Sequence, residues 1–406
     1  MRTLLLTGPG GAGTTTLAAA AAVRAARDGR RVVLVTRQPV PDGTAAAGVE
    51  VVVAEPQAGL EALWAERVAG PASAVPDLEL PPATSVVPLP GAGELGVLAA
   101  LGRVRPDTDL VVLDAGPLPA ATGLVALPGA LRWWLQQVLT TRVRVLAAVR
   151  TAAVRAGTVR RGAADLALDA VPDLEALLDR LRLTDPAATA VWLVGRPRPS
   201  AVAALRTATT ALAVHGQRPV GVLARRLPAA GPADWAVARA AEEEAALAGL
   251  AGIAPVRDVA EAPVEPAGAE ALAALLPDLP DLPGPAGDPA PPVPAPERVD
   301  GGWRLTLPLP FAERAGVRLT RWDDDLVVTA AGTRRSLRLD PLLRRCVVTS
   351  GTLADPGTAA ARLEVGFAAD PQQWPADLLA AVGADGAEGA PSSGAADGPA
   401  DDRGTR

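Results

Sequence analysis

The amino end of this chain reads as an apolar strand, a glycine-rich loop and the start of a helix. Residues 2–7 are the expected strand, and residues 14–28 are the expected alanine-rich helix. Residues 8–15, G-P-G-G-A-G-T-T, match the phosphate-loop pattern G-x-x-x-x-G-K-[ST] except at the lysine. Thr14 stands at that position, and the chain contains no lysine that could replace it. The loop predicts a nucleotide-binding frame and leaves open whether the chain is an enzyme.

Further apolar runs follow the first strand and are separated by helical stretches. They are residues 31–36, 49–53, 109–114, 191–194 and 220–224. Continuous apolar runs are typical of strands that are covered on both faces. Alternation of strand and helix predicts a doubly wound, mostly parallel sheet. We therefore expect an α/β domain over residues 1–276.

A helical insertion is expected within this domain, over residues 129–183. It contains an apolar group around Trp133 and Trp134. These two indoles either pack on the sheet or form the wall of a hydrophobic groove, and we favour packing on the sheet.

The composition changes after residue 276. Residues 277–300 are rich in proline, aspartate, glycine and alanine, which predicts a semi-extended linker. From residue 301 onward apolar residues alternate with polar or small ones, and this period of two predicts a small β-sandwich over residues 301–370. Residues 376–406 are rich in alanine, glycine, aspartate and serine, so we expect them to be disordered.

Charge and cysteine content narrow the classes of function. The net charge is -6 with basic and acidic residues mixed, so no basic stripe for nucleic acid is expected. Cys346 is the single cysteine, which excludes an internal disulfide or a cysteine-based metal site and is consistent with a cytoplasmic protein. The amino end is too short and wrongly flanked for a signal peptide. No transmembrane segment is expected, because no uncharged apolar stretch reaches about 18 residues.

Four segments of the first domain carry motifs. Residues 9–16 read P-G-G-A-G-T-T-T, residues 90–94 P-G-A-G-E, residues 109–117 D-L-V-V-L-D-A-G-P, and residues 127–131 L-P-G-A-L. In this order they resemble the deviant phosphate loop, the P-G-x-x-E segment, the second switch and the L-P-x-x-L motif of one ATPase family. That family contains the arsenite-pump ATPase (ArsA) and the ATPase that targets tail-anchored membrane proteins. Residues 307–311 and 332–339 resemble the small-heat-shock-protein-like (α-crystallin) domain of its bacterial members.

The resemblance implies a site for ATP and Mg²⁺ at the glycine loop. In this family the loop N–H groups surround the phosphates at a helix N-terminus, where the helix dipole favours anions. Thr15 aligns with the hydroxyl that binds Mg²⁺, and Asp114 aligns with the acid that holds the ion through water. The implied nucleotide-binding residues are Gly8, Gly10, Gly11, Gly13, Thr14, Thr15 and Thr16, and the implied metal residues are Thr15 and Asp114.

The same resemblance implies that the catalytic charges are lost, so no residue is assigned a catalytic role. Pro9 and Thr14 replace the two loop lysines of the family. Residues 37–38, Arg-Gln, replace the acid that positions the attacking water, and Ala224 replaces the adenine-reading asparagine. Removing one preorganised transition-state donor costs roughly 10²–10³ in rate. Arg37 either restores part of the positive charge or is a solvated loop residue, and we favour the second.

Other chemistries of the family are not expected in this chain. Arsenite capture uses clustered thiols, and the zinc at the dimer interface of the targeting ATPase uses C-x-x-C pairs. With Cys346 alone, neither an arsenite site nor a zinc site is predicted. His215 is the single histidine and precedes a glycine, so we expect a helix-terminal or surface residue rather than a catalyst.

Three hypotheses for function follow. The first is a non-hydrolysing, nucleotide-binding pseudo-ATPase subunit that forms a homodimer or pairs with an intact paralogue. The second is a working transport or targeting ATPase in which partner residues or Arg37 replace the lysines. The third is a chaperone-like binder of hydrophobic helical segments, which would use the region of Trp133 and Trp134, the β-sandwich or both.

Overall fold

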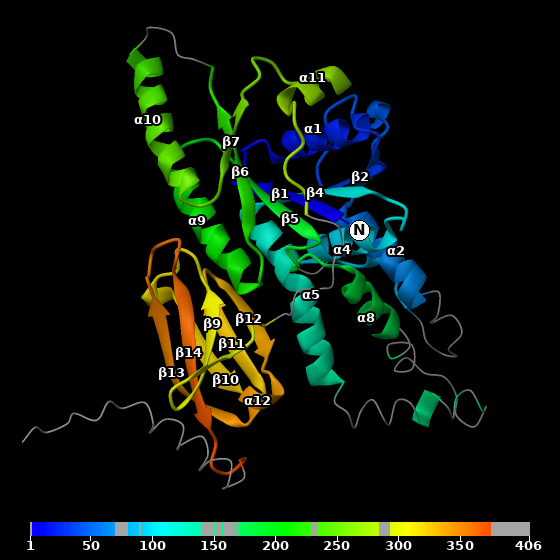
Figure 1. The fold of residues 1–406 in the computed structure, drawn as a ribbon. Helices are drawn as coiled ribbons and strands as arrows, with labels where there is room; N and C mark the ends of the chain where they lie inside the picture. The colour runs from blue at the N-terminus through cyan, green and yellow to red at the C-terminus, as the bar shows by residue number, and fades with distance from the viewer. Residues whose placement is uncertain are drawn as a thin grey trace, which may run out of the picture.

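The computed structural model describes residues 2–69, 80–88, 91–139, 149–151, 171–228, 234–283 and 293–374, with the single positions 154, 156 and 168. Within these residues an α/β domain and a smaller β-sandwich lie side by side (Figure 1). The predicted disordered tail, residues 376–406, lies outside the described residues.

One parallel sheet has the strand order β3-β2-β4-β1-β5-β6-β7. The strands are β1 (Arg2–Gly8), β2 (Val32–Thr36), β3 (Glu50–Val53), β4 (Leu110–Pro117), β5 (Thr189–Gly195), β6 (Pro219–Arg226) and β7 (Val256–Ala260). The predicted apolar runs all form strands of this sheet, and the doubly wound α/β fold is confirmed. Strand β7 was not predicted, because its sequence V-R-D-V-A carries two charges. The strand lies at an edge of the sheet and is only partly buried.

Helices cover both faces of the sheet. One face carries α1 (Thr14–Arg27) and α11 (Gly268–Leu275), and the other carries α4 (Ala92–Arg103), α5 (Leu118–Val138), α9 (Pro199–Val214) and α10 (Asp234–Ala251). On β1, Leu4 and Leu6 belong to the core on the α1 side, whereas Leu5 belongs to the opposite core. This alternation follows from the period of two in a strand, and it explains why both kinds of position are apolar.

Smaller elements complete this domain and its surroundings. They are the helices α2 (Pro56–Leu63) and α8 (Val171–Arg180), a π-helical turn at Trp64–Ala69, and 3₁₀ turns at Ala45–Ala47 and Ala83–Ser85. Within the described residues, no helix combines the length and the apolar character that crossing a bilayer requires.

The expected helical insertion begins inside a longer helix. Residue 129 lies within α5, which continues to Val138 and carries the two tryptophans. The rings of Trp133 and Trp134 are in edge contact with centroids 5.0 Å apart, and 60% of Trp134 is exposed. Trp134 therefore does not pack on the sheet as favoured. Most of residues 140–170 lies outside the described residues.

The C-terminal unit consists of two antiparallel sheets. The first has the order β10 (Arg318–Trp322), β11 (Asp325–Ala330), β12 (Thr333–Arg338), and the second β13 (Cys346–Ala354), β14 (Arg362–Ala369), β9 (Gly302–Pro308), β8 (Glu297–Val299). A 3₁₀ turn (Arg314–Gly316) and the helix α12 (Pro341–Arg344) connect them. Leu305, Leu326 and Val365 are fully buried in the core of this unit. Strand β13 was not predicted, because its sequence lacks regular alternation and most of its residues are exposed or partly exposed.

The ends of the expected linker are structured. Glu297–Val299 forms β8, which pairs with β9. At the other end, the indole Nε1 of Trp192 on β5 donates a hydrogen bond of 3.0 Å to the carbonyl of Asp281. Residues 277–283 therefore lie against the α/β domain, and residues 284–292 are outside the described part of the chain.

The sandwich lies against α9 and α5 of the α/β domain (Figure 1). Thr210 Oγ1 donates a hydrogen bond to the carbonyl of Pro310 at 2.5 Å. Arg335 Nη1 donates to the carbonyl of Val214 at 3.2 Å, and the Val214 side chain belongs to the core of the sandwich. The two units thus share buried side chains.

Candidate functional site

The glycine loop connects β1 to α1 at the carboxyl edge of the parallel sheet. Gly11 and Gly13 have φ values of 76° and 88°, which only glycine adopts without strain. A Cβ on Gly8 would lie 2.1 Å from the carbonyl oxygen of Val194, so the strand end also requires glycine. A Cβ on Gly10 would meet nothing within 4 Å. The loop is therefore open at Gly10 and Gly11, close to the N-terminus of a helix, a geometry that suits an anion.

Thr15 and Asp114 meet at the start of α1, although 99 residues separate them. Thr15 Oγ1 donates a hydrogen bond to Asp114 Oδ2 at 2.7 Å, and Thr36 Oγ1 donates to the same oxygen at 2.8 Å. The backbone N–H of Gly116 donates to Oδ1 at 3.2 Å. Only 2% of Asp114 is exposed. A hydroxyl and a carboxylate side by side form an oxygen donor set that fits Mg²⁺.

Thr14 and Thr16 flank this hydroxyl on α1. Thr14 is the first residue of the helix and is buried. Its side chain is three carbons shorter than that of lysine, so it brings neither the reach nor the charge of the residue it replaces. Thr16, the residue after Thr15, lines a pocket beside the loop.

Residues 37–40, which directly follow β2, include the cation Arg37 and no acid. Arg37 is not solvated as favoured from the sequence: its side chain is 22% exposed, and Nη1 lies 3.3 Å from Glu94 Oε1 on α4. A Cβ on Gly116 would lie 3.6 Å from Arg37 Nη2, which places the guanidinium beside the end of β4. Glu94 therefore supplies an acid near this segment, but its carboxylate is paired.

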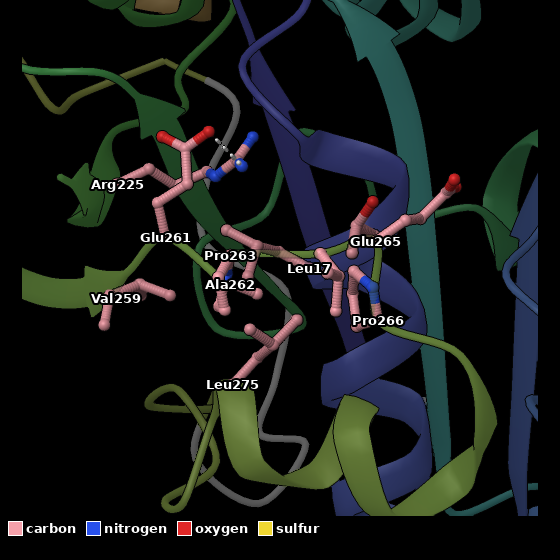
Figure 2. A pocket seen from close by; sticks show the side chains of 12 residues that line it. Leu17, Arg225, Val259, Glu261, Ala262, Pro263, Glu265, Pro266 and Leu275 are labelled. Atoms are coloured by element: carbon pink, nitrogen blue, oxygen red, sulfur yellow. Dashed lines mark ion pairs between the residues drawn. The ribbon is translucent and has the colours of Figure 1, made fainter. Parts of the chain in front are cut away.

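A pocket of about 280 Å³ opens between the start of α1 and the segment that follows β7 (Figure 2). It is lined by Thr16, Leu17, Arg225, Val259, Glu261 and Pro263, among others. Ala224 does not line it, because its methyl group is buried in the core on the opposite face of the sheet. The next residue, Arg225, enters the pocket from the end of β6.

Arg225 connects this pocket to the loop. Its Nη1 donates a hydrogen bond of 3.1 Å to the carbonyl of Ala12. Its Nη2 lies 3.3 Å from Glu261 Oε1, and the same oxygen accepts a hydrogen bond of 2.8 Å from Arg196 Nη2. Burial lowers the pKa of Arg225 below its ordinary value, an effect that Glu261 opposes and Arg196 reinforces. Sequence reasoning missed Arg225 and Glu261, and the only local signal was the arginine pair that ends β6.

His215 ends α9 far from the loop, at the interface with the sandwich. The expectation of a helix-terminal residue is confirmed, since His215 follows Val214 directly, but the side chain is only 4% exposed and is not a surface residue. Its Nε2 lies 2.8 Å from Thr333 Oγ1 on β12. Burial, with a smaller contribution from Arg335, lowers the pKa of His215 to about 4. The imidazole is therefore a neutral interface group.

A glycine loop between the first strand and first helix of a seven-stranded parallel sheet defines a P-loop-like α/β class. Residues 1–46 match the family described as "Anion-transporting ATPase", the ArsA ATPase, and residues 300–367 match the "HSP20-like domain found in ArsA". The chain belongs to the ArsA ATPase family.

Two relatives are similar to this chain, one over nearly its whole length and one over a short part of it. The chain is 36% identical over 397 residues to "Uncharacterized protein SCO2128" of Streptomyces coelicolor, which covers 92% of this chain and 99% of that protein. It is 41% identical over 73 residues to "Protein Rv2184c" of Mycobacterium tuberculosis, which covers 18% of this chain and 16% of that protein. The similarity to the first relative therefore extends over both the α/β domain and the sandwich.

Proposed function

We propose that this member of the ArsA family binds a Mg²⁺-nucleotide at the glycine loop without hydrolysing it efficiently, and acts as a binding or regulatory subunit. The observation that carries the proposal is the contact between Thr15 and Asp114 beside a loop with no cationic side chain at positions 9 and 14. The frame for phosphate and metal is kept, while the side chains that accelerate phosphoryl transfer are not present at those positions.

The binding roles follow from the donors at the loop. The Ala12 N–H donates to the carbonyl of Pro9 at 3.0 Å, so the other backbone N–H groups between Gly10 and Thr15 would hold the phosphates, helped by the positive end of the α1 dipole. The Thr15 hydroxyl and the Asp114 carboxylate would hold Mg²⁺, directly or through water. When bound, Mg²⁺ neutralises phosphate charge. The open pocket beside Thr16 and Arg225 offers space for the nucleoside.

Slow hydrolysis is expected because phosphoryl transfer depends on positioned charge. A charge-assisted hydrogen bond is worth about 1.5–3 kcal/mol, and loss of one preorganised donor costs roughly 10²–10³ in rate. Two lysines and a water-positioning acid are replaced together here. Glu94 is close to the segment that would position water, but its pairing with Arg37 opposes that role.

Calorimetric titration with Mg²⁺-ATP and Mg²⁺-ADP tests the binding half of the proposal. Thr15→Ala and Asp114→Asn are expected to weaken binding about tenfold or more, whereas Thr15→Ser keeps the hydroxyl and serves as the matched control. A turnover assay on the same samples tests the other half. Turnover typical of an ordinary ATPase, on the order of 1–10³ s⁻¹, that disappears in Thr15→Ala would refute the pseudo-enzyme.

The partner in this proposal is a second copy or an intact paralogue from the same organism. Co-expression followed by affinity purification and light scattering tests for such a pair. If a heterodimer forms, its ATPase rate is expected to change when Asp114→Ala is introduced into this chain alone. An unchanged rate in a proven heterodimer argues against a regulatory role for this site.

A second candidate is binding of a hydrophobic helical segment, and it is favoured by the exposed end of α5. Trp134 and Val138 are 60% and 63% exposed on this helix. A variant that keeps Trp134 as its sole tryptophan reports on this surface, because a bound apolar helix should shift its emission to shorter wavelength. An unshifted spectrum at saturating peptide would exclude this surface as the binding site.

A further inference from the structure

Arg225 reaches the glycine loop from a strand that is not adjacent to it. Strand β5 lies between β6 and β1 in the sheet, yet Arg225 Nη1 donates a 3.1 Å hydrogen bond to the carbonyl of Ala12. A Cβ on Gly13 would lie 2.3 Å from the same Nη1 atom, so the guanidinium rests directly on the last residue of the loop. Figure 2 shows the arginine extending from β6 toward the loop.

The guanidinium is held in this orientation by its surroundings. Glu261, one residue beyond β7, pairs with Arg225 Nη2 at 3.3 Å and with the exposed Arg196 at 2.8 Å. Two cations share this one carboxylate, so the cluster carries a net positive charge next to the loop. Arg225 is half-buried, which limits the screening of its charge by water.

We propose that Arg225 is the positioning residue of the phosphate site, which fixes the glycine loop through Ala12 and provides from β6 the positive charge that position 14 lacks. The ligand class is the polyphosphate of a Mg²⁺-nucleotide, so this inference rests on the proposed nucleotide binding. A donor on the outside of the loop orients the N–H groups on its inside, and the nearby charge favours an anion there.

Hydrogen exchange in the free protein tests the loop-fixing role without any ligand. In Arg225→Ala the amides of Ala12 and Leu17, which donate to the carbonyls of Pro9 and Gly13 at 3.0 Å each, are expected to exchange about tenfold faster or more, as expected for loss of a hydrogen bond to a charged group. Arg226→Ala is the matched control, because it removes the same charge one position further on, where Arg226 pairs with Asp258 and Glu244 at the surface. Equal exchange of the Ala12 and Leu17 amides in Arg225→Ala and wild type overturns the inference.

Titration with Mg²⁺-ATP and with Mg²⁺-tripolyphosphate tests the charge. Arg225→Ala is expected to weaken both about tenfold to a hundredfold, Arg225→Lys to recover part of the loss, and Arg226→Ala to change neither by more than about twofold. Loss of ATP affinity with unchanged tripolyphosphate affinity would assign Arg225 to the nucleoside and overturn the charge role. Wild-type protein that binds neither anion overturns the proposed function, and hydrogen exchange then still decides whether Arg225 fixes the loop.

Discussion

His215 makes the junction between the two units sensitive to acid. Its imidazole is 4% exposed at the end of α9 and lies 2.8 Å from the hydroxyl of Thr333. Burial is the main reason that its pKa falls to about 4, and the neighbouring Arg335 lowers it further. Arg335 is itself buried, and burial lowers its pKa to about 10, so it stays charged at neutral pH. The folded protein therefore resists protonation of His215.

The sign and size of the pH effect follow from linkage. An unfolded histidine has a pKa near 6.5, so between about pH 6.5 and pH 4 the unfolded state binds more protons than the folded state. The contribution of His215 to the free energy of unfolding is therefore fully present above pH 6.5 and is lost as the pH falls toward 4. Lowering the pH from 7.5 to 5 should cost about 2 kcal/mol through this single group.

The measurement is direct because His215 is the single histidine of the chain. In a histidine-labelled sample, the imidazole resonances should report a neutral ring down to about pH 5. Urea unfolding at pH 7.5 and pH 5 should show about 2 kcal/mol more loss in wild type than in His215→Gln. Thr333→Val removes the hydroxyl and keeps the titrating ring, so it should retain the extra loss. A ring that titrates near pH 6.5 in the folded protein would refute the reasoning.

Three further outcomes are expected. Burial raises the pKa of the Cys346 thiol to about 11, and the residue is 2% exposed. A disulfide reagent at pH 8 should therefore label Cys346 only after unfolding. Prompt labelling of the native protein would contradict this. Gly13→Ala should destabilise the ligand-free protein by about 1–3 kcal/mol, because of its positive φ and the contact with Arg225, whereas Gly10→Ala should have little effect. Leu305→Ala should cost about 2–5 kcal/mol in thermal or urea unfolding, since Leu305 is fully buried in the sandwich, and a loss below 1 kcal/mol would argue against that core.

Most of the fold could be predicted because its strands have strong local signals. Strands buried on both faces are continuous apolar runs, and β1, β2, β4 and β5 all read this way. Strands at sheet edges carry weaker signals, because only part of each strand needs to be apolar. All three strands that went unpredicted, β7, β8 and β13, are edge strands. Residue 129, the expected start of the helical insertion, lies inside α5, which continues through Pro128 to Val138.

The site divides in the same way between local and distant information. Thr15 and Asp114 could be predicted to meet, because each belongs to a recognisable motif at the carboxyl end of a central strand. The contact of Arg225 with Ala12 joins residues 213 positions apart, and no local pattern says where an arginine at a strand end will point. The pairing of Arg37 with Glu94 depends likewise on the placement of α4 over β2. Side-chain partners of this kind require the tertiary structure.

The sequence predicts only a covalent connection between the two units, through the proline-rich segment, whereas the structure also shows a packed contact between them at α9. This helix begins three residues after Arg196, which pairs with Glu261 beside the loop, and ends next to His215, which is buried against the sandwich. Its 16 residues span about 24 Å. Because one helix begins near the glycine loop and ends at the sandwich, docking of the sandwich and the geometry of the loop share a structural element. The sandwich is therefore part of the packed framework of the α/β domain.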